Sequence, residues 1–159
     1  MIWQRSNRFD PKAVSIADRH YNRQKPGSPQ FMPPGSCRVL VANNGKAVFG
    51  LSFPKPEFVK HAWAGAWVCS IFRNEGAGPL ASDMIRDAMA VMQTEYDVPA
   101  IGCITFVNPK KVPGILVRGE RVKGFCFMKA GFEAVGETKG GLIAWQMKPS
   151  AMPTPRRLC

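Results

Sequence analysis

The sequence has few of the residues that usually carry proton transfer or bind metals. Among its 159 residues only two are histidine and two are tyrosine, and 22 basic residues outnumber 11 acidic ones. None of the cysteines forms a C-x-x-C pair, so no zinc-type ligand spacing is present. No apolar run approaches the ~20 residues that a membrane-spanning helix needs, and we expect no contact with a membrane.

The cysteines and the first residues predict the cellular compartment. The five cysteines are odd in number and widely spaced, at Cys37, Cys69, Cys103, Cys126 and Cys159. This pattern does not suit a disulfide framework, so we expect reduced thiols that mostly fill the core. The run MIWQRSNRFD contains no apolar signal region, and we therefore expect a cytoplasmic protein.

The net charge of +11 is distributed unevenly along the chain. Basic residues exceed acidic ones by seven in residues 1–60 and again by seven in residues 110–159, whereas acidic residues are in excess by three in residues 61–109. Two basic flanks suit a polyanionic partner, which is most often a nucleic acid, and DNA is the partner we expect. The alternative is that these side chains only solvate the surface.

The order of the expected elements indicates a mixed α/β (α+β) fold in one domain, with one parallel crossover. Asp10-Pro11 is typical of a helix start, and Asn43-Asn44-Gly45 is typical of a tight hairpin turn. Strands are expected at 36–42, 46–53, 64–72, 100–107, 132–138 and 142–147, and helices from 11 toward 21, at 79–96 and at 123–130. The domain is expected to span 1–148, and the basic, Pro-rich residues 149–159 to form a flexible tail.

A glycine-rich turn follows the central apolar strand in the run WVCSIFRNEGAGPL, residues 67–80. Such a turn, placed between a strand and a helix, directs backbone N–H groups toward one point, which suits a pyrophosphate. The simpler alternative is that Gly76-Ala77-Gly78 only makes the turn.

The spacing R-x-x-G-x-G from Arg73 to Gly78 resembles the coenzyme A loop of the GNAT superfamily of N-acetyltransferases. A second fragment, residues 124–136, resembles the short helix, G-F turn and strand that close that fold. The resemblance implies a GNAT-like mixed central β-sheet flanked by helices, with acetyl-CoA or a related acyl donor held between two splayed strands. It also implies that the cofactor is bound by Arg73, Gly76, Ala77 and Gly78.

The chain departs from the GNAT pattern at the residue that commonly protonates the leaving thiolate. The family has a tyrosine four residues before the glycine of the G-F turn, and here that residue is Phe127. A phenyl ring has no proton to donate, so Cys126 or water would have to replace it. The general acid and base of ordinary acetyl transfer are therefore left open.

A second polar cluster, with the sequence DRHYNR, lies at residues 18–23. Histidine is well matched to proton transfer near neutral pH, and the cluster precedes a loop too rich in Pro and Gly to be core. We expect His20 and Tyr21, together with Arg73, to be the catalytic residues. The alternative is a basic helix end with His20 packed against Ile16.

The run from His20 to Gly27 also resembles the H-Y-S-[RK]-x-x-P-G segment of the bacteriophage Mom DNA-modification proteins, a divergent GNAT branch. Those proteins share a strand end like residues 69–73 and a strand ending in D-P, where this chain has Asn108-Pro109. The resemblance implies a phage or prophage transferase that modifies adenine or another amino-bearing DNA base. Because Asn108 replaces the aspartate, a shared mechanism does not follow. No metal site is expected; iron at His20 is conceivable, but no ligand spacing supports it.

The two basic flanks would straddle a DNA duplex, and a target base would have to be flipped out to reach a site. Phe31, Trp63 or Trp67 are candidates to stack on it, although the tryptophans also suit a core. The expected phosphate-binding residues are Arg19, Arg23, Lys25, Lys110, Lys111, Arg118, Arg121 and Lys123.

Two other functions remain open from the sequence. One is an N-acetyltransferase that uses acetyl-CoA on a small molecule or protein, and the other is an inactive GNAT fold that binds nucleic acid. The sequence leaves the oligomeric state open as well, and a homodimer is possible.

Overall fold

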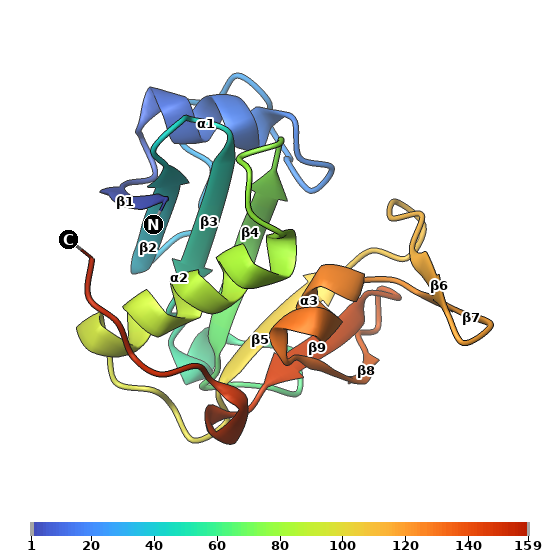
Figure 1. Cartoon of the computed structure of the whole chain (residues 1–159). Coiled ribbons are helices and arrows are strands. Elements are labelled where there is room, and N and C mark those ends of the chain that lie inside the picture. The colour runs from blue at the N-terminus through green and yellow to red at the C-terminus, as the bar shows by residue number, and fades with distance from the viewer. Residues whose placement is uncertain (1, 159) are drawn as a thin grey trace.

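A seven-stranded mixed sheet forms the body of the protein (Figure 1), and the computed structural model describes residues 2–158. The strand order is β1-β2-β3-β4-β5-β9-β8, with every neighbouring pair antiparallel except β4 and β5. The predicted mixed sheet in one α+β domain is confirmed. The strands are β1 (Trp3–Ser6), β2 (Cys37–Ala42), β3 (Ala47–Ser52), β4 (Trp67–Asn74), β5 (Cys103–Val107), β8 (Glu133–Glu137) and β9 (Ile143–Met147).

Three α-helices flank the sheet: α1 (Pro11–Asp18), α2 (Ala81–Glu95) and α3 (Phe125–Ala130). The start of α1 is as predicted, because the Asp10 carboxylate accepts a hydrogen bond from the backbone N–H of Lys12 and Pro11 is the first helical residue. The helix ends at Asp18, earlier than expected, so that His20 and Tyr21 lie in the turn that follows it. No helix in residues 2–158 is long and apolar enough to cross a membrane.

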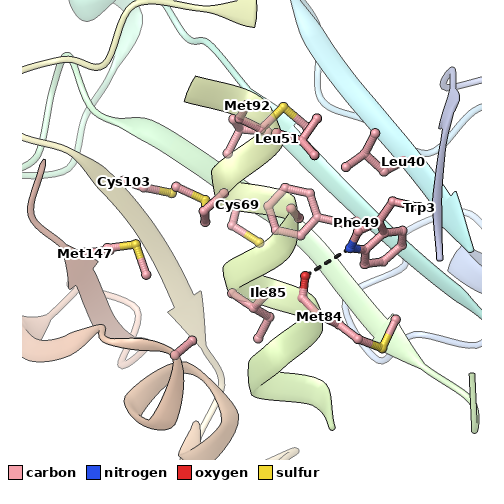
Figure 2. Packing of buried hydrophobic residues seen from close by; sticks show 14 of the residues in the cluster. Trp3, Leu40, Phe49, Leu51, Cys69, Met84, Ile85, Met92, Cys103 and Met147 are labelled. Atoms are coloured by element: carbon pink, nitrogen blue, oxygen red, sulfur yellow. Dashed lines mark hydrogen bonds between the residues drawn. The ribbon is translucent and has the colours of Figure 1, made fainter. Parts of the chain in front are cut away.

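The core has two layers because alternate residues of each strand point to opposite faces of the sheet. Phe49 and Leu51 of β3 face α2, whereas Val48 faces Ile16 of α1. Figure 2 shows the larger layer, in which side chains of α2 pack on the sheet and the Trp3 indole N–H donates to the carbonyl of Met84 at 3.0 Å. Every residue of β3 is therefore buried.

Three short strands of the structure were not predicted from the sequence. Strand β1 pairs with β2 at the edge of the sheet, and its three consecutive polar residues after Trp3 give no strand signal. The expected basic loop contains a hairpin, β6 (Ile115–Val117) and β7 (Glu120–Val122), which projects from the body (Figure 1). Its two-residue turn is Arg118-Gly119, and both residues have positive φ, as a type I′ turn requires.

The described part of the expected tail lies against α2. A single turn of 3-10 helix, η2 (Pro149–Ala151), follows β9, and a second one, η1 (Pro56–Phe58), follows β3. Beyond η2, the Arg156 guanidinium forms an ion pair with Asp87 at 2.7 Å, and the Gln93 side chain donates to the Pro153 carbonyl at 2.7 Å. These contacts attach the segment to the domain, in contrast to the expected flexible tail.

Candidate functional site

The central feature of the site is a division in the middle of the sheet. Strands β4 and β5 pair over only three residue pairs, of which Cys69 with Thr105 is the last. At this point β4 has an extra residue, Ser70, because Cys69 and Ile71 lie opposite the adjacent residues Leu51 and Gly50 of β3. A bulge of this kind bends and twists a strand, and beyond it β4 and β5 diverge (Figure 1).

The turn after α1 covers the freed edge of β4. The Asn22 side-chain N–H donates to the Ser70 carbonyl at 3.0 Å, which satisfies a backbone group that β5 no longer pairs with. The Asn22 side-chain oxygen then faces His20 and lies 2.7 Å from its Nδ1. The Asn22 backbone N–H also donates to Nδ1, at 3.2 Å, so Asn22 holds this ring nitrogen with both its side chain and its backbone.

The surroundings of His20 favour its neutral form. Burial lowers the pKa of His20, and the positive charge of Arg73 lowers it further, although the Asn22 side chain and the Phe72 backbone act in the opposite direction. A histidine that is neutral at physiological pH can accept a proton from a substrate.

Tyr21 links the His20 turn to the far side of the gap. Its ring stacks on the His20 imidazole at a centroid distance of 4.6 Å, and its hydroxyl oxygen accepts a hydrogen bond from the backbone N–H of Asn108 at 3.3 Å. Asn108 directly follows β5. The structure thus brings together His20, Tyr21 and Arg73, the residues expected from the sequence to carry the chemistry.

Arg73 and Arg19 share one carboxylate. Glu75 lies 2.7 Å from Nε of Arg73 and 2.6 Å from a terminal nitrogen of Arg19. The hydrogen bond from Arg19 is the largest influence that lowers the pKa of Glu75, to about 2, and Arg73 adds to it. Both arginines, expected to bind the cofactor or DNA, are therefore paired within the protein, and an incoming anion has to compete with Glu75.

The glycine loop after β4 has an open outer surface. Gly76 and Gly78 both have positive φ, and within residues 2–158 no atom apart from those of the adjacent residues lies within 4 Å of where a Cβ would be at either position. Ala77 is held from both sides, because its N–H donates to Asn74 and its carbonyl accepts from Asn44, each at 2.9 Å. The loop is fixed in shape, and no side chain caps the start of α2.

Three adjoining cavities run through the gap. The outer one, of about 450 Å³, lies between the starts of α2 and α3 and the β6–β7 hairpin, and it is lined by Leu80, Ile115, Phe125 and Lys129 among others. The middle one, of about 170 Å³, lies between β4 and β5 and is lined by His20, Tyr21 and Phe127. The third cavity, of about 340 Å³, lies on the side of the gap that is opposite the outer cavity. Cys126 lines the first two, whereas Tyr21, Ser70 and Phe106 line the last two.

Neither Phe127 nor Cys126 is a good proton donor. Phe127 packs edge-on against Phe132 with ring centroids 5.4 Å apart, so it fills space beside the gap. Burial raises the pKa of Cys126, which makes its thiol less acidic than an ordinary alkyl thiol. Proton transfer from Cys126 to a thiolate leaving group is therefore energetically uphill.

The eight basic residues expected to bind DNA fall into two groups. Arg23 forms an ion pair with Asp18 at 2.7 Å and its side chain is only 8% exposed, while Arg121 and Lys123 donate to carbonyl groups of residues 112–114. With Arg19 bound to Glu75, four of the eight have structural partners. The other four have no side-chain partner within residues 2–158: Lys25, Lys110, Lys111 and Arg118.

The aromatic residues expected to stack on a base lie in different surroundings. Trp67 is 4% exposed and belongs to the core, and Trp63 packs against Phe106 with ring centroids 6.0 Å apart. Phe31 lines a polar groove of about 620 Å³ together with Lys25. Phe106 and Tyr21, which the sequence did not single out for stacking, line the third cavity.

Several residues of the site carried no local sequence signal. Ser70 and Thr105 lie at the bulge in β4, where Thr105 donates to the Cys69 carbonyl at 2.9 Å. Lys129 is at the end of a short helix and reaches the outer cavity only through the tertiary fold. Within residues 2–158, no three His, Cys, Asp or Glu residues gather closely enough to hold a metal ion. The described cysteines are free thiols, and Cys159 lies outside the described residues.

Comparison of the chain with protein-family models, with curated proteins and with solved structures found no match. What this site can do therefore follows from its own geometry and chemistry.

Proposed function

We propose that the protein is a GNAT-fold group transferase of the Mom-like kind found in phages and prophages, and that it modifies an amino group of a DNA base. The observation that carries the proposal is the position of His20. A neutral imidazole lines the gap between two diverging strands, and a cavity adjoins that gap on each side. An activated donor and an amine can meet there beside a proton acceptor.

The outer cavity and the glycine loop fit an acyl donor such as acetyl-CoA. Gly76 and Gly78 present open backbone to a phosphate group, and Lys129 adds a positive charge at the rim of the cavity. Ala77 contributes by holding the loop, since its own N–H is already bound to Asn74. When bound, such a donor supplies the activated group that is transferred.

The residues of the gap prepare the acceptor. The imidazole of His20 accepts the proton that the amine loses, and Asn22 fixes the ring by contacting Nδ1 and by donating to the Ser70 carbonyl. Arg73 helps to keep the ring neutral before the reaction. Tyr21 packs on the ring and restricts the access of water from the far cavity.

The charge of the protein supports a nucleic acid as the acceptor. Lys25 and Lys111 line the openings on the far side of the gap, and the net charge of the chain is +11. Lysines without protein partners are the groups that bind phosphates and release counterions.

The test is mass spectrometry of nucleosides from DNA incubated with the purified protein and acetyl-CoA, and from DNA of cells expressing it. We expect a modified nucleoside from the wild type and from His61→Gln, and none from His20→Gln. His61 is the matched control because it is the only other histidine and lines none of the three cavities. Transfer to small amines or proteins alone would favour the N-acetyltransferase alternative. DNA binding without any transfer would favour the inactive module.

A further inference from the structure

The third cavity has the chemistry of a site for a flat, partly polar ring. Two of its walls are aromatic, Tyr21 and Phe106, and Pro33 and Leu142 add apolar surface. The polar atoms are few and come from Asn22, Ser70 and Asn108. A mostly apolar pocket with a few fixed hydrogen-bonding groups is typical of a site for a small heteroaromatic ligand.

The walls of this cavity are held in place by the fold. The loop that carries Pro33 is anchored by Met32, which is 3% exposed and packs on Gly50 of β3, where a Cβ would lie 2.6 Å from the Met32 sulfur. Tyr21 is fixed by the His20 ring and by the N–H of Asn108. A site with preformed walls loses little entropy when it binds a ring.

The inner end of the cavity leads to the proton acceptor. Tyr21, Asn22, Ser70 and Phe106 line both this cavity and the gap, where His20 lies. An amino group on the inner edge of a bound ring would therefore point toward the gap. Lys111 lines the same cavity and has no side-chain partner within residues 2–158, so its charge is available to a phosphate attached to such a ring.

We propose that this cavity captures a single nucleobase extruded from DNA, stacked against Tyr21 and Phe106, with Lys111 on a phosphate of the same strand. The assignment rests on the proposed function, because it takes DNA as the acceptor. A ring with an exocyclic amine and an attached phosphate matches the aromatic walls, the amide groups and the outer lysine together.

The experiment measures binding alone, with no acyl donor present. Three short duplexes of one sequence are compared by fluorescence anisotropy: a fully paired duplex, one with an adenine opposite an abasic site, and one with abasic sites on both strands. An unpaired adenine leaves the helix at little cost, so we expect the wild type to bind the second duplex about tenfold more tightly than the first. The third duplex, which is as flexible but has no base to capture, should bind like the first.

Matched variants test whether the aromatic walls of the cavity bind the base. Tyr21→Phe keeps the ring and should keep the preference for the unpaired adenine, whereas Tyr21→Leu and Phe106→Leu should abolish it. Tyr21 is 40% exposed, so its replacement does not threaten folding. Lys111→Ala should weaken binding to all three duplexes equally and lower the salt slope by about one unit, while Lys148→Ala, at the opposite end of the sheet, should not.

The outcomes separate this inference from the proposed function. Equal binding of the paired and unpaired-adenine duplexes by the wild type, or a preference that survives both leucine variants, would overturn the base pocket even if DNA is modified. A preference that depends on Tyr21 and Phe106 would support the pocket even if no transfer to DNA is found.

Discussion

Strands β3 and β8 lie in the same sheet, yet their surroundings are opposite. All residues of β3 are buried between α1 and α2, and all residues of β8 are exposed at the edge. The glycine loop and the His20 turn are attached to the β3 side, while the other wall of the gap belongs to the β5-β9-β8 side. The comparison indicates that β3 contributes more to stability than the edge strand β8, and that the border between the two sides of the sheet holds the candidate site.

The largest expected effect tests the buried strand β3. Phe49→Ala in β3 should lower the free energy of unfolding by about 3–5 kcal/mol, because it removes a fully buried ring and leaves a cavity. Val135→Ala in β8 should cost under about 1 kcal/mol, since Val135 is 36% exposed. Urea denaturation followed by circular dichroism measures both values. Similar losses would show that the two strands contribute alike.

The end of the sheet at which β4 and β5 pair should be nearly as sensitive to substitution. Gly102 has φ +77°, and a Cβ there would lie 2.1 Å from the Met147 carbonyl oxygen, so Gly102→Ala should cost about 3 kcal/mol. Gly141→Ala is the matched control, because Gly141 also has positive φ but no atom lies within 4 Å. It should cost about 1 kcal/mol, from backbone strain alone. Equal thermal shifts for the two variants would mean that the clash is relieved elsewhere.

At the border between the two sides of the sheet, a substitution should lower the proposed activity without lowering stability. His20→Gln should reduce the rate of transfer at least ~100-fold, as expected for the loss of a general base, and change the free energy of unfolding by under about 1 kcal/mol. The wild-type rate should rise with pH and reach its plateau below neutrality, because burial lowers the pKa of His20. A rate that still rises above pH 7 would exclude a neutral His20 as the proton acceptor.

The smallest effect concerns Glu75. Its pKa falls from the ordinary 4.5 to about 2 in the folded protein, so its ion pairs stabilise the fold above pH 4.5 and are lost as the pH falls toward 2. Since Arg19 is 51% exposed, solvent screening reduces the gain to about 1 kcal/mol. The difference in melting temperature between the wild type and Glu75→Gln should therefore shrink from pH 7 to pH 3. A difference in melting temperature that stays constant with pH would show that the substitution acts through packing and not through charge.

The sequence predicts the elements with strong local signals. Asn44-Gly45 marks the β2–β3 turn, Asp10-Pro11 marks the start of α1, and the apolar stripe of residues 79–96 marks α2. Polar residues before a loop also pointed to His20 and Tyr21, which the structure places in the gap.

Features that depend on distant partners could not be predicted in this way. The bulge at Ser70 is visible only against β3, the carboxylate shared by Arg19 and Arg73 joins two segments far apart in the chain, and the Arg156–Asp87 pair attaches the last residues to α2. Charge counting treats paired and unpaired cations alike, so it could not separate Arg23 from Lys111.

The divergence of β4 and β5 also places a strand edge in the interior of the sheet. Unpaired strand edges invite strand addition by another chain, which leads to self-association. The Asn22 amide bound to the Ser70 carbonyl blocks this edge, so the turn that presents His20 also acts as a guard against aggregation. Changes in this turn should therefore affect solubility as well as the proposed activity, which limits how freely its residues can vary.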